Sequence, residues 1–319
     1  MLFFEYFRSA GSAVAQTFLL GAVGYILMKR EFLGEQCLNT LSRLTMDITL
    51  PAMIFCSLIR DFSFSAYPRW WLFPLASIAI TLIGLGVGGL FLGFIKGHEQ
   101  KMQFLSLIGF QNSGFLPLML FATILPPDKA ATMFIYLFLF LIGFNAAIFS
   151  LGVLMLASSK AGKFEWGSLF NPPVAATLLG LSLVFLGVNR SIPQALILPV
   201  KMLGDCTLPL AMLVVGGSIA QIKLHTIDKK AMALMVLAKL IILPVAGLIV
   251  MVYLKPSALV SLLLLVELAV PAATTSSVII RHYKKEDHLI SQGIFVSHLA
   301  GVITLPVFLS LLFTLGRLR

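Results

Sequence analysis

Two short polar clusters in an otherwise apolar sequence carry the side chains best suited to hold a small molecule. The first, Asn112-Ser113-Gly114, precedes Pro117, and the second, Thr274-Thr275-Ser276, follows Pro271. Their amides and hydroxyls are uncharged hydrogen-bonding groups. The clusters are therefore candidates for a binding site that holds its ligand through neutral hydrogen bonds.

The composition indicates a membrane protein. Of 319 residues, 59% are hydrophobic and 11% are charged, and the mean hydropathy is +1.00. A helix that crosses a bilayer needs roughly 20 apolar residues. We find ten candidate segments, centred near residues 20, 49, 82, 113, 143, 180, 209, 242, 269 and 301. The predicted fold class is an all-α polytopic membrane protein with ten transmembrane helices, and we expect the first of them to be retained rather than cleaved as a signal peptide.

The net charge of +10 does not predict a nucleic-acid partner, because the basic residues are spread over the loops between the segments. Thirteen lysines and arginines fall on one set of alternate loops, and nine fall on the other set and the termini. The positive-inside rule then places both termini outside the cytoplasm.

Both polar clusters lie in the middle of an apolar segment. Proline has no N–H and clashes with the carbonyl four residues before it, so a helix should open just before Pro117. Broken helices at membrane depth occur where they face protein or a water-filled cavity, and transporters place substrate sites there. The alternative is a simple proline kink, with Asn112 bonded to a neighbouring helix.

The two halves of the chain repeat a motif. Asp47-x-Thr-Leu-Pro51 in the second segment matches Asp205-x-Thr-Leu-Pro209 in the seventh, and Pro271 in the ninth corresponds to Pro117 in the fourth. Five segments per half is an odd number, so the second half must enter from the opposite side as an inverted repeat. We expect a first repeat over residues 1–156, a cytoplasmic linker over 157–170 and a second repeat over 171–319.

The repeated motif has two interpretations. Asp or Thr could cap the helix that restarts at the proline by accepting hydrogen bonds from its first N–H groups. Alternatively, Asp47 and Asp205 could bind a proton or a cation during transport.

Ionisable groups inside spans are functional candidates, because burying charge in a membrane is unfavourable. Lys239 and Glu267 lie about nine residues into successive antiparallel spans, which brings them to nearly the same depth. They predict an ion pair, either static or exchanging a proton during transport. His298 could relay protons or could be a packed, hydrogen-bonded residue. Asn145 lies at mid-depth in the fifth segment.

No signature of catalysis is present. The sequence has no G-x-S-x-G, H-E-x-x-H or P-loop motif. Its three cysteines form no CxxC pair and no His/Cys cluster, so neither a disulfide framework nor a metal site is indicated. No cofactor is expected. We do not expect an enzyme.

Several motifs in this order resemble those of the auxin efflux carrier family, the PIN-like permeases and their bacterial members, within the superfamily that also contains the bile acid transporters. The resemblance covers essentially the whole chain. Its motifs are Asp-x-Thr-Leu-Pro-Ala at 47–52, Asn-Ser-Gly-Phe-Leu-Pro-Leu at 112–118, Asn171-Pro172, Leu203-Gly204-Asp205, Lys239-Leu240 and Val-Pro-Ala-Ala-Thr at 270–274. Many relatives carry an asparagine shortly after the last proline, where this chain has Thr275-Ser276-Ser277.

The resemblance implies a scaffold from spans 1, 2, 6 and 7 that forms a homodimer, and a moving transport domain from spans 3–5 and 8–10. It also implies that broken spans 4 and 9 cross at Pro117 and Pro271, and that an elevator mechanism moves an auxin-like anion or a mono- or dicarboxylate. The short loops favour a bacterial permease of the inner membrane. The alternatives are a sodium-coupled carrier of the bile acid symporter type, which needs a cage of oxygen ligands, and a channel or membrane sensor.

Overall fold

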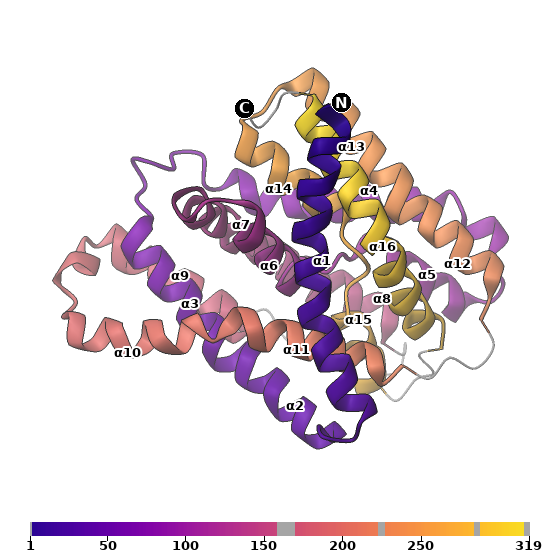
Figure 1. Cartoon of the computed structure of the whole chain (residues 1–319), viewed down its shortest axis with the longest axis horizontal. Coiled ribbons are helices and arrows are strands. Elements are labelled where there is room, and N and C mark those ends of the chain that lie inside the picture. Colours follow the sequence, from indigo (N-terminus) through magenta and orange to yellow (C-terminus); the bar gives the residue numbers. More distant parts are fainter. Residues whose placement is uncertain (1, 158–169, 223–226, 284–287, 316–319) are drawn as a thin grey trace.

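The computed structural model describes residues 2–157, 170–222, 227–283 and 288–315 (Figure 1). This part of the chain is helical, and its β-structure is confined to an isolated antiparallel bridge between Gln111 and Ala272. The predicted all-α class is confirmed. The predicted linker at 157–170 lies almost wholly outside the described residues.

The helices alternate with short connections along both halves of the chain. The first half contains α1 (Leu2–Lys29), α2 (Glu35–Leu44), η1 (Thr45–Thr49), α3 (Leu50–Asp61), α4 (Leu72–Gly89), η2 (Leu92–Phe94), α5 (His98–Gly109), α6 (Phe115–Ile124), α7 (Pro127–Ala147), η3 (Ile148–Gly152) and α8 (Val153–Leu156). The second half contains α9 (Pro172–Phe185), η5 (Val188–Ser191), α10 (Gln194–Asp205), α11 (Thr207–Ala220), α12 (Lys229–Val236), η6 (Leu237–Ile242), α13 (Leu243–Leu254), α14 (Ala258–Ala269), α15 (Thr275–His282) and α16 (His288–Thr314).

Seven helical stretches within the described residues are long and apolar enough to cross a membrane. They are Leu2–Lys29, Glu35–Asp61, Leu72–Gly89, Pro127–Leu156, Gln194–Ala220, Lys229–Leu254 and His288–Thr314. The other three expected spans coincide with the shorter apolar helices α6, α9 and α14. The chain is a polytopic membrane protein, and its ten-span inverted repeat stays a prediction.

Two prolines widen their helices without breaking them. Just before Pro51, the N–H of Leu50 bonds to the carbonyl of Thr45, five residues back, and η1 is a π-helix. Just before Pro244, the N–H of Leu243 bonds to the carbonyl of Ala238 in the same way. A π-turn inserts one extra residue and often marks a functional site. The second of these turns carries Lys239.

The longest helix, α1, packs closely on α11 and α16 (Figure 1). Glycines allow this approach, because a Cβ on Gly216 would collide with the carbonyl of Gly21, and one on Gly24 would collide with the backbone of Leu213. Close approach of small residues is a usual way to pack helices in a bilayer, where water drives no association. Tyr6, near the start of α1, packs edge to face on Phe313, near the end of α16. The first helix therefore begins where the last one ends.

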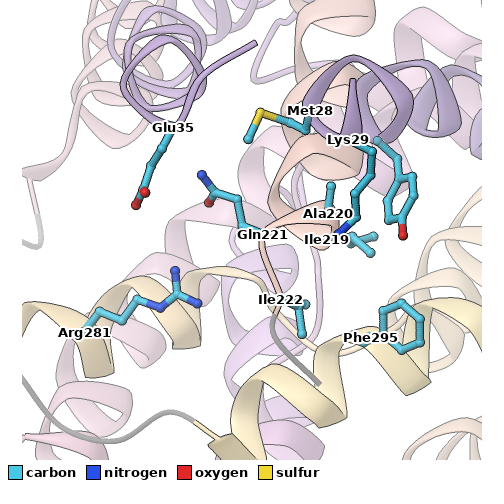
Figure 2. Close-up of a pocket in the computed structure, with 10 residues that line it drawn as sticks. Met28, Lys29, Glu35, Ile219, Ala220, Gln221, Ile222, Arg281 and Phe295 are labelled. Carbon is cyan, nitrogen blue, oxygen red and sulfur yellow. The ribbon is translucent and has the colours of Figure 1, made fainter. Parts of the chain in front are cut away.

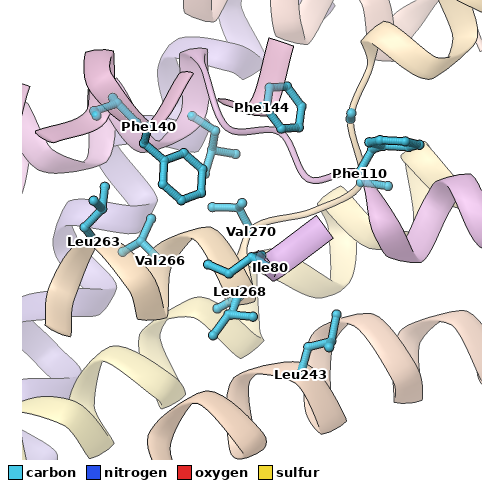
Figure 3. Close-up of a cluster of buried hydrophobic side chains, with 14 of the residues drawn as sticks. Ile80, Phe110, Phe140, Phe144, Leu243, Leu263, Val266, Leu268 and Val270 are labelled. Atoms are coloured by element: carbon cyan, nitrogen blue, oxygen red, sulfur yellow. The ribbon is translucent and has the colours of Figure 1, made fainter. Parts of the chain in front are cut away.

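The main apolar core surrounds the interrupted helices. Figure 3 shows Ile80 of α4, Phe140 of α7 and Leu243 of α13 in this cluster. Phe110 and Val270, which both lie between helices, are fully buried in it. These two side chains fix the non-helical backbone inside the protein, where it is shielded from lipid.

Candidate functional site

Two helices are interrupted at the predicted places. The helix α5 ends at Gly109 and α6 begins at Phe115, whereas α14 ends at Ala269 and α15 begins at Thr275. We call residues 110–114 the first extended segment and residues 270–274 the second extended segment.

The two extended segments pair with each other in antiparallel fashion. The N–H of Asn112 donates to the carbonyl of Pro271 at 2.9 Å, and the N–H of Ala273 donates to the carbonyl of Phe110 at 3.0 Å. The N–H of Ala272 donates to Ser297 Oγ of α16 at 3.2 Å. Outside a helix, the backbone N–H and carbonyl groups of each extended segment lack their helical hydrogen-bond partners, and the other segment replaces some of them. Two interruptions can therefore be tolerated inside a membrane protein.

Each proline has a different local role. Pro117 is the third residue of α6, where a helical N–H has no intrahelical partner, so this proline marks the restart of a helix. Pro271 lies in the second extended segment, and a Cβ on Gly301 of α16 would come within 2.9 Å of its ring. Neither proline lines the cavity that the extended segments enclose.

A cavity of about 60 Å³ lies beside the paired segments. Six of the residues predicted to contact substrate line it: Asn112, Ser113, Gly114, Asn145, Thr274 and Thr275. The rest of its wall is formed by Met46, Leu50, Gln111, Phe115, Leu141, Phe144, Pro173 and Ala273. The structure therefore brings polar groups from both halves of the chain together around one space.

The cavity lies at the starts of two helices. Gly114 and Thr274 occupy the N-cap positions of α6 and α15, and neither provides a side-chain cap hydrogen bond. Helix N-termini carry a positive partial charge and point N–H groups outward. Together with the neutral side chains, they give this space the electrostatic character of an anion site.

Asn112 is held in one orientation by His298. The Nδ1 atom of His298 lies 2.8 Å from the carbonyl of Ile294, which can only accept, so Nδ1 carries the proton. The Nε2 atom of the neutral ring then accepts from Asn112 Nδ2 at 3.3 Å. This geometry leaves the oxygen of the Asn112 amide available on the other side of that group. His298 is thus a positioning residue for Asn112 in this structure.

Two other residues predicted to contact the substrate, Ser276 and Asn145, form hydrogen bonds within the protein. Ser276 accepts from Ser106 Oγ at 3.0 Å and does not line the cavity. Asn145 does line the cavity, but its oxygen accepts from Asn171 Nδ2 at 2.9 Å, and its Nδ2 donates to the carbonyl of Leu141. Asn171 in turn caps α9 by accepting from the N–H of Val174 at 3.1 Å.

Lys239 and Glu267 are both buried, with exposed fractions of 1% and 0%, and their charges interact. The predicted direct ion pair is wrong, however. Among the described residues, N–O distances within 4.0 Å join only Arg43 to Asp47, Arg60 to Asp61 and Lys201 to Asp205. The side chains that face the Glu267 carboxylate are those of Ser113 and Gln111. The depth of the two charges follows from the sequence, but their contact depends on how each helix is rotated.

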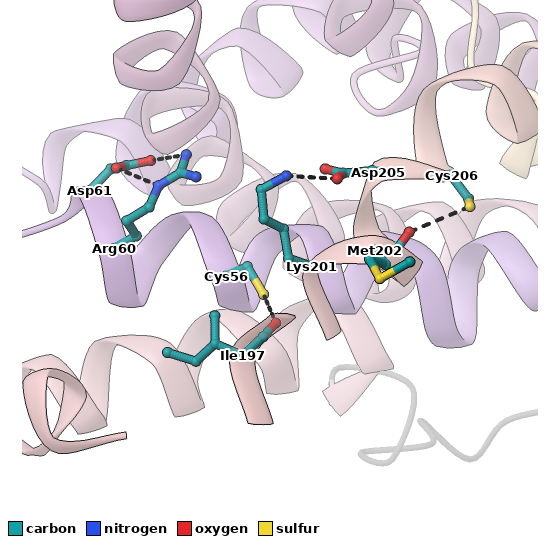
Figure 4. A network of polar contacts seen from close by, with 8 residues as sticks. All are labelled: Cys56, Arg60, Asp61, Ile197, Lys201, Met202, Asp205 and Cys206. Atoms are coloured by element: carbon teal, nitrogen blue, oxygen red, sulfur yellow. Dashed lines mark hydrogen bonds and ion pairs between the residues drawn. The ribbon is translucent and has the colours of Figure 1, made fainter. Parts of the chain in front are cut away.

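Asp47 and Asp205 of the repeated Asp-x-Thr-Leu-Pro motifs lie outside the cavity, although Leu50 of the first motif lines it. No side-chain cap bond forms at either helix restart, so the capping interpretation is wrong. Asp47 lies 3.9 Å from Arg43, and Asp205 lies 2.6 Å from Lys201, each pair one turn apart on its own helix. Figure 4 shows the ion pair of Asp205 with Lys201. The side chain of Asp205 is 61% exposed.

Several residues at the crossing were not predicted from the sequence. Gln111 adjoins the predicted cluster and is fully buried. Ser106 bonds to Ser276 at the start of α15, and Ser297 bonds to the second extended segment. The sequence could have indicated Gln111, because it is a polar residue inside an apolar span directly before Asn112. The two serines carried none, because serine is common in membrane helices without any role in a site.

A polytopic helical protein with two discontinuous helices that meet at buried polar segments has the architecture of a membrane transporter. The comparison with protein families agrees. A family model described as membrane transport protein matches residues 10–166 and 161–309, which is nearly the whole chain. The chain therefore belongs to this family, and the resemblance to the auxin efflux carriers is confirmed. Comparison with curated proteins gave no match.

Proposed function

We propose that the chain is a secondary carrier for a small organic anion, of auxin-like or mono- or dicarboxylate type. The observation that carries the proposal is the meeting of two helix N-termini with Asn112, Ser113, Thr274 and Thr275 around one buried space. Positive helix ends attract a carboxylate, and neutral side chains add hydrogen bonds without a fixed countercharge. Weak binding of this kind is compatible with release on the other side.

The cavity must widen for an organic acid to bind. At about 60 Å³, it holds no more than a few water molecules in this conformation. Its wall combines Met46, Leu50 and Pro173 on one side with the two extended segments on the other. Movement between these two groups of elements would open it.

Three hollows along α1 support such a movement. Their volumes are about 440, 300 and 750 Å³, and they follow α1 from its start to its end. Each hollow has α1 on one side and residues of α6, α15 or α16 on the other. The helix α11 also lines the hollows of about 300 and 750 Å³. Figure 2 shows the largest, with Glu35, Gln221 and Arg281 around it and Lys29 and Phe295 at its other side.

The hollows lie along the boundary at which the proposed scaffold (spans 1, 2, 6 and 7) would meet the proposed transport domain (spans 3–5 and 8–10). We therefore include in the proposal an elevator movement of the transport domain, two inverted repeats of five spans, and a homodimer formed through the scaffold. We also place the protein in the inner membrane, with both termini outside the cytoplasm. Reporter fusions at the two ends of the chain test this orientation, because a cytoplasmic reporter signal from either end would contradict it.

Counterflow in proteoliposomes tests the proposed function. The purified protein should exchange a labelled carboxylate against an internal excess of the same acid, and the exchange should saturate. Asn112→Ala should abolish it. Asn189→Ala is a matched control, because the Asn189 amide bonds to the Ile59 carbonyl at the end of α3 and does not line the cavity. Single-channel currents without saturable exchange would instead support a channel.

A further inference from the structure

Two asparagine amides meet at the edge of the cavity. Asn145 belongs to α7 and lines the cavity, whereas Asn171 precedes α9 and does not line it. The Nδ2 atom of Asn171 lies 2.9 Å from the Oδ1 atom of Asn145. The oxygen and the nitrogen of an amide have nearly the same shape, so what each group offers to a ligand depends on which way its neighbours turn it.

The start of α9 fixes the orientation of the Asn171 amide. The first two residues of α9 are Pro172 and Pro173, which have no N–H, so the first N–H that a cap can bind belongs to Val174. This N–H donates to Asn171 Oδ1 at 3.1 Å. Because an amide nitrogen cannot accept there, Asn171 must direct its Nδ2 elsewhere, and Asn145 receives it.

Asn171 and the backbone of α7 together fix the orientation of the Asn145 amide. Its Oδ1 accepts from Asn171, and its Nδ2 donates to the carbonyl of Leu141 at 2.8 Å. The second N–H of that Nδ2 has no acceptor among the described residues. Asn145 is 8% exposed and lines the cavity, so this N–H is a donor that a carboxylate in the cavity can use.

The bond between the two amides also crosses the boundary between the two proposed domains. The helix α7 corresponds to span 5 of the proposed transport domain, and α9 corresponds to span 6 of the proposed scaffold. A movement of one domain against the other separates the amides. Asn145 therefore has Asn171 as a partner in the arrangement of this structure and loses it in the other.

We infer that Asn171 is a positioning residue for the substrate site. The start of α9 sets the Asn171 amide, and Asn171 holds the Asn145 amide so that an N–H, and not an oxygen, is offered to the anion. The site gains this oriented donor only while the two proposed domains are packed as in this structure. The inference rests on the proposed function, because it assigns Asn171 a role toward the same anion.

Asn171→Ser tests this role, because serine is an equally good cap but has no amide to donate to Asn145. The affinity of the purified full-length protein for benzoate and for malonate is measured from their effect on thermal unfolding, with chloride at equal ionic strength as the reference. Loss of the orienting hydrogen bond should weaken binding about fivefold. In counterflow of the same acid, the half-saturation concentration should rise by a similar factor. The maximal rate should not fall, because the lost bond is one that the movement has to break.

Two comparisons separate this role from a purely structural one. Asn189→Ser is the matched control, since the Asn189 amide also donates to a distant segment, at the Ile59 carbonyl, but lies away from the cavity. This variant should bind both acids as the wild type does. In an Asn145→Ala background, Asn171→Ser should cause no further loss of affinity, because Asn171 acts through Asn145.

If the serine variant does not fold, Asn171→Asp replaces it in the same cycle, because aspartate keeps the cap and lacks the N–H donor. Repulsion between its charge and the anion persists in the Asn145→Ala background, whereas the loss that passes through Asn145 disappears there.

A folded Asn171→Ser variant with wild-type affinity would overturn the inference, and so would an equal loss with and without the Asn145 side chain. Either result leaves the carrier proposal intact. The expected changes in binding, together with an absence of saturable counterflow by the wild-type protein, would contradict the carrier proposal alone. Binding of neither acid to the wild-type protein would contradict both.

Discussion

The hydrogen bond between His298 and Asn112 gives the sharpest test of the site. The variant His298→Phe keeps a flat ring of similar size in a position that is 2% exposed, but it removes the acceptor at Nε2. Asn112 Nδ2 then has no partner, and the amide is free to turn its oxygen away from the orientation that the ring fixes. We expect the anion to bind more weakly as a result.

The size of this effect can be worked out from the geometry. At 3.3 Å the bond is long for an N–H donor, so we take about 1 kcal/mol from the usual range for a buried hydrogen bond. That corresponds to roughly a fivefold rise in the half-saturation concentration for counterflow. The maximal rate should change less, because the lost hydrogen bond orients a substrate-binding group and does not join the two proposed domains.

The assay is counterflow at several substrate concentrations, combined with thermal unfolding of each variant. His298→Gln should restore most of the affinity, since its amide oxygen can accept from Asn112. Leu299→Ala is the control, because Leu299 is the next residue in α16 and is 64% exposed. A folded His298→Phe variant with an unchanged half-saturation concentration would refute the reasoning, and so would a folded His298→Gln variant that remains as weak as His298→Phe.

Four further variants test the packing and the site boundaries. Gly24→Ala should destabilise the protein by about 1–3 kcal/mol in denaturant unfolding, because the added Cβ meets the backbone of α11, whereas Gly11→Ala meets nothing and should gain up to about 1 kcal/mol. Gly301→Ala should lower the unfolding temperature by overpacking the proline ring of the second extended segment, and an unchanged temperature would contradict that contact. Asp205→Asn should keep at least half of wild-type counterflow, because the exposed ion pair of Asp205 lies outside the cavity. Loss of transport in this variant would instead support a role for Asp205 in binding a proton or cation.

The interruptions were predictable because their causes are local. Pro117, Pro271 and the adjacent small and polar residues weaken a helix wherever it lies, so the positions of both breaks follow from the sequence. The pairing of the two extended segments depends on backbone carbonyl and N–H groups, and almost every residue type carries both. Nothing in the side chains indicates that Asn112 bonds to Pro271 and Phe110 to Ala273.

The charged residues show the same division. Counting residues predicts one depth for Lys239 and Glu267, and both are buried. It did not show that Ser113 and Gln111 would face the carboxylate, because helix rotation decides which side chains meet. The π-turns change that rotation, and their effect on Asp47 and Lys239 cannot be read from a regular periodicity of 3.6 residues.

The reciprocal pairing at the crossing has a consequence for how this chain can evolve. Each extended segment is the hydrogen-bonding template of the other, through Asn112 with Pro271 and Phe110 with Ala273. An insertion or deletion in either segment would shift the register of both and leave main-chain groups unsatisfied in a buried place. The two halves can therefore diverge freely in their loops and outer helices, but these two stretches of five residues must keep their lengths together.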